Sequence, residues 1–196
     1  MKVDVLETRD LHQGFLKLRQ FRLKYERFDG RMSREMAFEV VDRGEAVTVI
    51  LYEPGADQVG LIRQFRIGAY LGENQGWCVE VVAGACDGEQ DLAAVARREI
   101  QEETGWQVID LQQVHSYYLA PGGSNERIHL FLGILAPGAP RKGGGGLEQE
   151  GEDIETLLLP FAQAWEMVFK GEINSASAIL ALQWLAMNRE RLQKEA

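Results

Sequence analysis

The chain has 196 residues and a formal net charge of −9 at pH 7. That length fits one domain with a small addition, and the charge argues against a general nucleic-acid binder or a protein that binds anionic membranes. The sequence contains two cysteines, Cys78 and Cys86, which we expect to be buried thiols rather than a disulfide. It shows no signal peptide and no apolar run as long as a membrane span, so we expect a cytoplasmic protein.

Alternating apolar and polar residues predict strands in the first part of the chain. The predicted strands are residues 1–6, 15–25 and 35–41, with a turn at residues 28–30. Together they predict a small antiparallel sheet. Because such a sheet is marginally stable alone, we expect it to pack on the main domain or on a second subunit. We therefore assign residues 1–42 to an N-terminal β-sheet segment and residues 43–196 to the main domain.

The main domain begins with a predicted β-hairpin, formed by residues 47–52 and 58–67 around a turn at residues 54–57. Arg66 lies at the end of the second strand. The pattern alone is equally consistent with a charged residue on an open strand face and with a residue that contacts a substrate.

A third strand is predicted at residues 77–82, followed by a bend at residues 83–84. Glu80 lies inside this strand among apolar residues. A buried carboxylate at such a position requires a partner, so we expect Glu80 to contact a ligand or an arginine.

A glycine loop then leads into a helix that contains the main functional signal. Asp91 is the predicted N-cap, and Gly105 is the predicted stop after the helix-forming residues 92–103. The apolar stripe that we expect to face the core consists of Ala93, Ala96 and Ile100.

Three carboxylates gather near the C-terminal end of this helix. Glu99, Glu102 and Glu103 have the spacing i, i+3 and i+4, so they project from one side of the last turns. Their charges repel one another and oppose the helix dipole. The pattern alone fits a solvated acidic helix end, and it also fits a site where magnesium or manganese neutralises the carboxylates.

The remaining chain predicts further strands at residues 114–119, 127–134 and 154–159, and helices at residues 161–170 and from residue 174 or 175 to about residue 192. Residues 120–127 form a predicted loop. Residues 136–152 combine four consecutive glycines with several carboxylates. We expect an acidic loop that is anchored at both ends and closes on a substrate, with a disordered acidic linker as the alternative.

The stretch around the helix resembles the Nudix box, G-x5-E-x7-R-E-U-x-E-E-x-G-U, in which U is a bulky apolar residue. The residues in register are Gly84, Arg98, Glu99, Ile100, Glu102, Glu103, Gly105 and Trp106. The one departure is Gln90, which stands where the family has its first glutamate. The resemblance implies an α+β protein: a Nudix α/β/α sandwich with a mixed central sheet, plus the small antiparallel N-terminal sheet.

The resemblance also implies the hydrolysis of a diphosphate with magnesium, or alternatively manganese, as cofactor. The implied metal ligands are Glu99 and Glu103, with Glu102 nearby as a ligand or bridge. The backbone carbonyl of Ala83 is a further ligand by family resemblance. We expect Arg98 to orient the carboxylates by ion pairing.

Residues outside the box resemble the ADP-ribose pyrophosphatase branch of the family, in which a proline follows the last glycine of the box at about the distance of Pro121 from Gly105. The substrate contacts implied by this resemblance are Arg66, Ser124 and Glu126. The loop resemblance places the general base on Glu150 and its support on Glu152. Two residues complete the expected substrate-binding set, Glu80 and Phe38, the latter by stacking on a base.

The implied reaction is attack of water on the diphosphate of ADP-ribose, which gives AMP and ribose 5-phosphate. Hydrolysis of another nucleoside diphosphate sugar such as GDP-mannose is the alternative, because that branch has a similar Arg-Gln-Phe-Arg strand and a glycine-rich acidic loop. A Nudix module that senses a nucleotide without turnover is a third hypothesis, which the full set of carboxylates disfavours. Members of the ADP-ribose branch are homodimers whose N-terminal sheet helps to build the partner's adenosine pocket. We therefore expect a homodimer that uses residues 1–42, with neither nucleic acid nor membrane as partner.

Overall fold

The structure is a computed structural model that describes residues 1–138, 144–147, 149 and 151–195. The chain divides into two compact units. One comprises Met1–Glu45 and Tyr117–Arg127, and the other comprises Ala46–Ser116 and Ile128–Ala196. The first unit therefore contains the three N-terminal strands together with residues 117–127, for whose place in this unit the sequence gave no sign.

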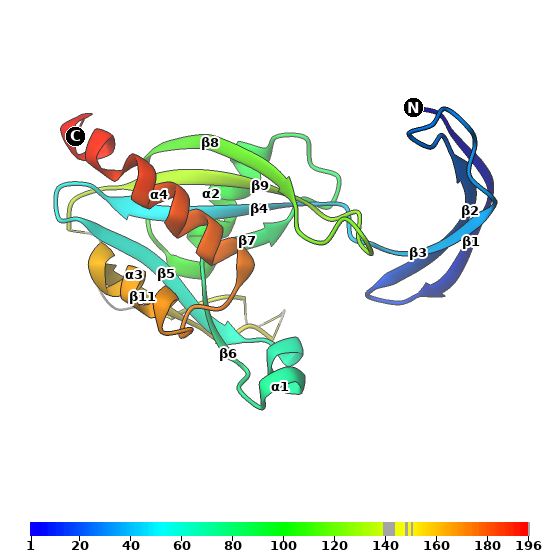
Figure 1. Cartoon of the computed structure of the whole chain (residues 1–196). Coiled ribbons are helices and arrows are strands. Elements are labelled where there is room, and N and C mark those ends of the chain that lie inside the picture. The colour runs from blue at the N-terminus through cyan, green and yellow to red at the C-terminus, as the bar shows by residue number, and fades with distance from the viewer. Residues whose placement is uncertain (139–143, 148, 150, 196) are drawn as a thin grey trace. The chain divides into compact units, whose positions relative to one another are not determined.

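The N-terminal unit contains a three-stranded antiparallel sheet in the order β1 (Val3–Gln13), β2 (Lys17–Tyr25) and β3 (Met36–Asp42) (Figure 1). The predicted small sheet is confirmed, although β1 extends well beyond residue 6. The predicted turn contains Gly30, whose φ of 77° favours glycine. Every residue of β1 is exposed, so the described chain provides no cover for the apolar side chains of this strand.

Residues 117–127 join this unit through Asn125. The Asn125 N–H donates to the carbonyl oxygen of Val41 at 3.3 Å, and its side-chain Nδ2 donates to Asp42 Oδ1 at 2.6 Å. This side-chain hydrogen bond is the main reason why the pKa of Asp42 lies below its ordinary value. Arg19 lowers it further. The end of β3 is therefore tied to a loop more than eighty residues later in the sequence.

In the described chain, the larger sheet has eight strands, in the order β10-β11-β5-β4-β9-β8, with β6 paired to β5 and β7 paired to β4. These strands are β4 (Glu45–Glu53), β5 (Gln58–Phe65), β6 (Trp77–Glu80), β7 (Val82–Ala85), β8 (Val108–Tyr118), β9 (Arg127–Leu135), β10 (Gly144–Gly145) and β11 (Ile154–Pro160). The described helices are α1 (Ile67–Glu73), α2 (Leu92–Thr104), α3 (Phe161–Phe169) and α4 (Ala176–Glu195). The predicted hairpin is confirmed as the antiparallel pair β4 and β5.

The strand predicted at residues 77–82 is divided between two partners. In β6, Glu80 lies opposite Ile62 of β5, whereas in β7, Ala83 lies opposite Thr48 of β4. The expected bend at residues 83–84 is wrong, because both residues continue β7, and the chain changes partner at Val81. A continuous apolar run contains no local signal for this change.

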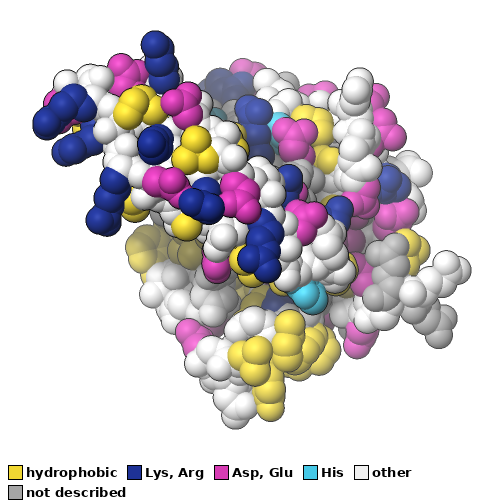
Figure 2. All heavy atoms as spheres, turned by 90° about the vertical axis from the view of Figure 1, so that its right-hand side faces the viewer, with side chains coloured by type: hydrophobic (Ala, Val, Ile, Leu, Met, Phe, Trp, Pro, Cys, Tyr) yellow, Lys and Arg dark blue, Asp and Glu magenta, His cyan; other side chains and the backbone are white. Residues whose placement is uncertain are grey.

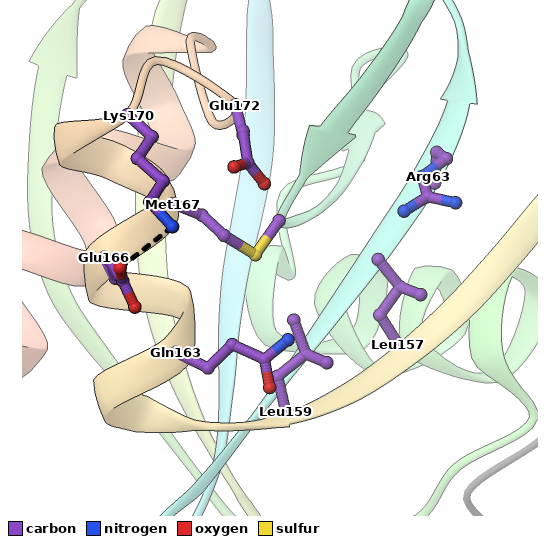
Figure 3. A pocket seen from close by; sticks show the side chains of 8 residues that line it. All are labelled: Arg63, Leu157, Leu159, Gln163, Glu166, Met167, Lys170 and Glu172. Carbon is purple, nitrogen blue, oxygen red and sulfur yellow. Dashed lines mark ion pairs between the residues drawn. The ribbon is translucent and has the colours of Figure 1, made fainter.

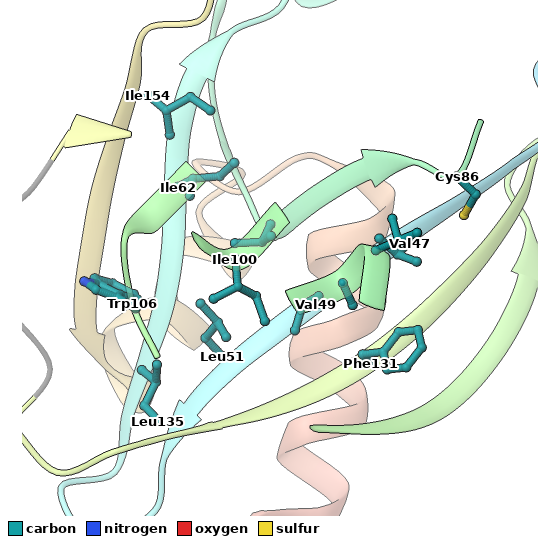
Figure 4. Packing of buried hydrophobic residues seen from close by; sticks show 13 residues of the cluster. Val47, Val49, Leu51, Ile62, Cys86, Ile100, Trp106, Phe131, Leu135 and Ile154 are labelled. Atoms are coloured by element: carbon teal, nitrogen blue, oxygen red, sulfur yellow. The ribbon is translucent and has the colours of Figure 1, made fainter. Parts of the chain in front are cut away.

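The hydrophobic core lies between α2 and one face of the larger sheet (Figure 4). Val49 and Leu51 of β4 and Ile100 of α2 are among its fully buried residues. Because strand side chains alternate, Ile50 and Tyr52 point to the opposite face, which α4 covers (Figure 1). The predicted α+β class, with helices on both faces of the sheet, is confirmed.

The helices depart from the predictions in two respects. The expected core stripe of α2 is partly wrong, because Ala93 is exposed and Val95 is buried in its place. Helix α1 was not predicted, and none of its residues is buried. Hydrophobic side chains gather at the lower edge of the face drawn in Figure 2, the level at which Figure 1 shows α1. None of the described helices is long and apolar enough to cross a membrane.

Candidate active site

Helix α2 is held at both ends by the predicted caps. The Asp91 carboxylate accepts hydrogen bonds from the N–H groups of Ala93 and Ala94 at 3.1 and 3.0 Å. Gly105 has a φ of 67°, and its N–H donates to the carbonyl oxygen of Gln101 at 2.9 Å. The apolar face of α2 is buried in the core. The backbone that carries the side chains of its last turns is therefore held in place.

The three carboxylates on these turns have different surroundings. Glu103 is only 3% exposed, and its Oε2 accepts a hydrogen bond from the N–H of Ala83 at 3.1 Å. Glu99 Oε1 accepts one from Arg98 Nη2 at 2.7 Å, and Arg98 Nε lies 3.6 Å from Glu102 Oε2. Two sets of contacts thus link the residues predicted for the metal site, Ala83 with Glu103 and Arg98 with Glu99 and Glu102, and the expected ion pairs of Arg98 are present.

A close contact with Glu99, rather than a turn, explains the glycine at position 84. Its φ lies outside the left-handed region, so its backbone does not require glycine. A Cβ at this position would overlap the carboxyl group of Glu99. The first glycine of the motif therefore provides the space in which the Glu99 carboxylate lies.

Burial changes the ionisation of this cluster. It raises the pKa of Glu103 to about 8, with the N–H of Ala83 acting in the opposite direction and the charges of Glu99 and Glu152 raising it further. Burial also raises the pKa of Glu99, partly offset by the hydrogen bond and charge of Arg98. Ionised carboxylates are therefore costly at this helix end unless a positive charge is added.

The family resemblance implies a divalent cation, and the chemistry of these residues fits one. Hard oxygen donors suit magnesium and manganese, and a cation would offset the burial and mutual repulsion of Glu99 and Glu103. Among the described residues, no three His, Cys, Asp or Glu side chains lie so that they could together hold a metal ion. Glu103 instead bonds to Ala83 and Glu99 to Arg98.

Arg66 and Glu80 form a second part of the site. Arg66 Nε donates to Glu80 Oε2 at 2.7 Å, and Gln64 Nε2 donates to the same oxygen at 3.3 Å. The expectation that Glu80 has an arginine partner is confirmed. The positive charge of Arg66 also lowers the pKa of Glu103, although by less than the other causes change it. The guanidinium therefore acts on the same carboxylate cluster.

The acidic loop is only partly described. Glu150, the predicted base, lies outside the described residues, as do residues 139–143 and 148. Glu152 is described, and its Oε2 accepts a hydrogen bond from the N–H of Leu147 at 3.1 Å. The glycine run is not wholly a loop, since Gly144 and Gly145 form β10 and pair with β11.

The other predicted substrate residues lie in the N-terminal unit. Ser124 Oγ accepts a hydrogen bond from the N–H of Glu126 at 3.1 Å, and Arg43 Nε donates to Glu126 Oε1 at 3.3 Å. Phe38 lies on β3 opposite Phe21 and is 37% exposed. Ser124 and Glu126 therefore belong to one small cluster, and Phe38 has surface free for stacking.

Two polar partners were missed by sequence reasoning. Gln64 lies two residues before Arg66, and the period of a strand places such residues on one face, so its contact with Glu80 had a usable signal. Arg43 pairs with Glu126 across 83 residues of sequence, for which no local signal exists.

A cavity of about 360 Å³ lies between α3, β5 and β11, away from these residues (Figure 3). Leu157, Leu159 and Met167 supply its apolar lining. The charged groups around it include Lys170, which pairs with Glu166 at 2.8 Å. None of the predicted site residues lines this cavity, so it is not the predicted reaction centre.

Comparison with known proteins shows which proteins this chain is similar to. The sequence model of the NUDIX domain matches residues 42–182. The chain is 35% identical to an ADP-ribose pyrophosphatase of Escherichia coli strain K12, over 98% of this chain and 92% of the relative. It is also 37% identical to an ADP-ribose pyrophosphatase of Haemophilus influenzae, over 98% and 89% of the two chains. A GDP-mannose pyrophosphatase of Shigella flexneri is 35% identical, over 95% and 96%.

The fold comparison agrees with these matches. A solved structure described as an ADP compounds hydrolase has a TM-score of 0.72 and 20% sequence identity, with 96% of each chain covered. This likeness supports the predicted Nudix architecture. The family match and the identity along almost the whole sequence show that the chain belongs to the Nudix family.

Proposed function

We propose that the protein is a magnesium-dependent pyrophosphatase that hydrolyses ADP-ribose to AMP and ribose 5-phosphate. The observation that carries this proposal is the buried Glu103 beside Glu99 at the end of α2, with Arg98 and the Ala83 backbone as partners. The relatives named ADP-ribose pyrophosphatase, which align with nearly the whole chain, support the substrate.

Glu99 and Glu103 would hold the cation, with Glu102 and the carbonyl oxygen of Ala83 as further donors. When bound, a divalent cation neutralises phosphoryl charge and acidifies a water molecule. Arg98 contributes by holding Glu99 and Glu102 in place through its two contacts. Manganese has similar ligand preferences and is the expected substitute.

Arg66 would bind oxygens of the substrate. Glu80 and Gln64 hold the guanidinium group from one side, through Arg66 Nε in the case of Glu80. The remaining N–H donors of an arginine suit anionic oxygens, since they form paired hydrogen bonds with such groups. In the N-terminal unit, Ser124 and Glu126 are proposed to contact the terminal ribose, and Phe38 to stack on the base.

The proposed general base is Glu150, with Glu152 as its support. A carboxylate that binds a metal ion is a poor base, so the proton of the attacking water should pass to a residue outside the helix. The base accepts one proton from water, and the new P–O bond forms as the diphosphate bridge breaks, so the two products are both phosphate monoesters.

Hydrolysis of GDP-mannose is the second candidate, because relatives with that name match at nearly the same identity. The test is a substrate panel with magnesium that contains ADP-ribose, GDP-mannose, ADP-glucose and diadenosine polyphosphates. The proposal expects AMP release from ADP-ribose to have the highest kcat/KM. Faster release of GMP from GDP-mannose would overturn the substrate, and tight binding without products would indicate a nucleotide sensor.

We also propose that the enzyme acts as a homodimer in the cytoplasm. The support for a dimer is β1, which is exposed along its full length and carries apolar residues such as Val3 and Val5. The support for the cytoplasm is that both cysteines, Cys78 and Cys86, are free thiols.

A further inference from the structure

The glycine run after residue 143 makes close contact with the end of α2. Gly145 lies opposite Ile154 in the pairing of β10 with β11. A Cβ at Gly145 would overlap the main-chain carbonyl group of Glu103. The N–H of Gly146 donates to the carbonyl oxygen of Glu102 at 2.8 Å. That oxygen is among the last carbonyls of the helix, which have no partner within the helix itself.

Leu147, which follows these glycines, contacts Glu152, and we refer to this described pair of residues as the Glu152 turn. The N–H of Leu147 donates to Glu152 Oε2 at 3.1 Å, and the N–H of Glu152 donates to the carbonyl oxygen of Leu147 at 3.3 Å. Gly146 has a φ of 93°, and a Cβ there would lie 2.8 Å from the Cβ of Glu152. Gly146 thus contacts Glu102 of α2 on one side and Glu152 on the other, which places Glu152 near the end of the helix.

We infer that Gly145 and Gly146 are positioning residues, whose contact with the C-terminal end of α2 sets the place of the Glu152 turn relative to the helix carboxylates. This inference rests on the proposed function. The helix residues that the two glycines touch, Glu102 and Glu103, are also proposed donors to the cation. One close approach and one hydrogen bond thus connect the two acidic parts of the site.

A substitution at Gly145 distinguishes this positioning role from the role of a flexible hinge. Its φ lies outside the left-handed region, so alanine suits the backbone as well as glycine does. The three nearest described atoms to an added Cβ all belong to the main chain of Glu103. A side chain at residue 145 should therefore move the turn away from α2. A displacement of about 1 Å can reduce a rate on the order of 10²-fold.

The test compares Gly145→Ala with Gly55→Ala, using ADP-ribose and magnesium. Gly55 also has no left-handed φ, and no atom lies within 4 Å of the place that an added methyl group would take, so it controls for the loss of glycine alone. We expect Gly145→Ala to lower kcat about 10- to 100-fold while KM changes less than about threefold. The control should retain the wild-type kcat. A wild-type kcat in Gly145→Ala, or an equal loss in Gly55→Ala, would overturn the inference.

A second comparison identifies the residue through which the glycine acts. In a Glu152→Gln background, Gly145→Ala should lower kcat by much less than in the wild type, because the carboxylate that it positions is already gone. Fully multiplicative losses would contradict the inference and indicate a general structural effect.

If Gly145→Ala does not fold, as judged by circular dichroism, Gly146→Ala takes its place. Its control is Gly138→Ala, since Gly138 has a similar φ of 78° but no close neighbour. We expect the same fall in kcat for Gly146→Ala but not for Gly138→Ala. Equal effects of these two substitutions would overturn the inference. An active wild type with unaffected variants would reject only the inference, whereas a wild type that hydrolyses no nucleotide sugar would reject the proposed function as well.

Discussion

At the scale of single residues, Glu103 shows how burial changes a common side chain. It is almost fully buried, its pKa is raised to about 8, and its hydrogen bond with Ala83 only partly offsets the loss of solvent. A carboxylate in such a place is stabilised when a cation is bound nearby. The folded protein should therefore gain stability from the same ion that the reaction requires.

Glu103→Gln tests this link. We expect the magnesium concentration for half-maximal activity to rise about 10-fold or more, because a neutral amide is a poorer ligand than a carboxylate. The magnesium-induced rise in Tm should shrink in parallel. Both quantities are measured by titration with magnesium, with Glu166→Gln as an exposed control on α3. An unchanged magnesium dependence would reject the assignment of Glu103 as a ligand.

The choice of base is tested by a pair of variants. Glu150→Gln should lower kcat by about 10² to 10⁴ while KM changes little, because the base acts in the chemical step. Glu152→Gln should have the smaller effect, since it supports the base. Steady-state kinetics with ADP-ribose would decide between them, and the reverse order of the two losses would assign the base to Glu152.

At the scale of elements, the network around Asp57 connects the β4–β5 hairpin to α4. Asp57 Oδ1 accepts a hydrogen bond from the buried Tyr52 hydroxyl at 2.8 Å, and Arg189 of α4 lies 3.3 Å from Asp57 Oδ2. The Arg189 guanidinium also lies 4.5 Å from the ring centroid of Phe161, at the start of α3. The β4–β5 hairpin and α4 therefore meet at the Asp57 carboxylate, and Arg189 extends this contact to the start of α3.

Tyr52→Phe should destabilise the protein by about 1–3 kcal/mol, because it removes a buried hydroxyl and leaves Asp57 without that donor. For a chain of this size, we expect Tm to fall by about 2–4 °C for each kcal/mol. Thermal unfolding measures the effect, and Tyr25→Phe is a matched control because Tyr25 is 41% exposed. Equal Tm values for the two variants would show that the network contributes no net stability.

The elements also show which features a sequence can predict. Helix α2 was predicted with both caps, because Asp91 and Gly105 are local signals that need no distant partner. The partner change at Val81 was missed, since it depends on which strands happen to lie beside the chain. The glycine run was interpreted as part of a loop that closes on a substrate. The contact of Gly145 with the Glu103 carbonyl, which lies far from it in the sequence, had no such local signal.

At the scale of the whole molecule, apolar surface is concentrated where the described chain gives it no cover. Val3, Val5 and Leu6 of β1 are all more than half exposed. Charged side chains of both signs are interspersed over the face drawn in Figure 2, so this surface does not form a single field of one sign. Several exposed apolar side chains close together on one strand, as on β1, are a feature of protein interfaces.

Replacing Val3 and Val5 together by glutamate should therefore convert the proposed homodimer to a monomer. We expect kcat/KM for ADP-ribose to fall at least about 10-fold, because the N-terminal sheet is proposed to complete the partner's site. Light scattering coupled to size-exclusion chromatography measures the mass. Met187→Glu, at an exposed position on α4, is the control and should remain dimeric. A wild-type protein that elutes as a monomer would contradict the proposed dimer.

Gly84 has no side chain and so leaves room for the Glu99 carboxyl group, which has a consequence for how the function of such a protein can change in evolution. A single nucleotide exchange converts a glycine codon into an alanine codon, and the added methyl group would meet the carboxyl group of Glu99. The strand and the core would keep their residues, while the first carboxylate of the cluster would lose its place. The proposed catalytic role of Glu99 would thus be lost in one genetic step with the rest of the binding surface intact, which would be a short route from an enzyme of this fold to a protein that only binds its nucleotide.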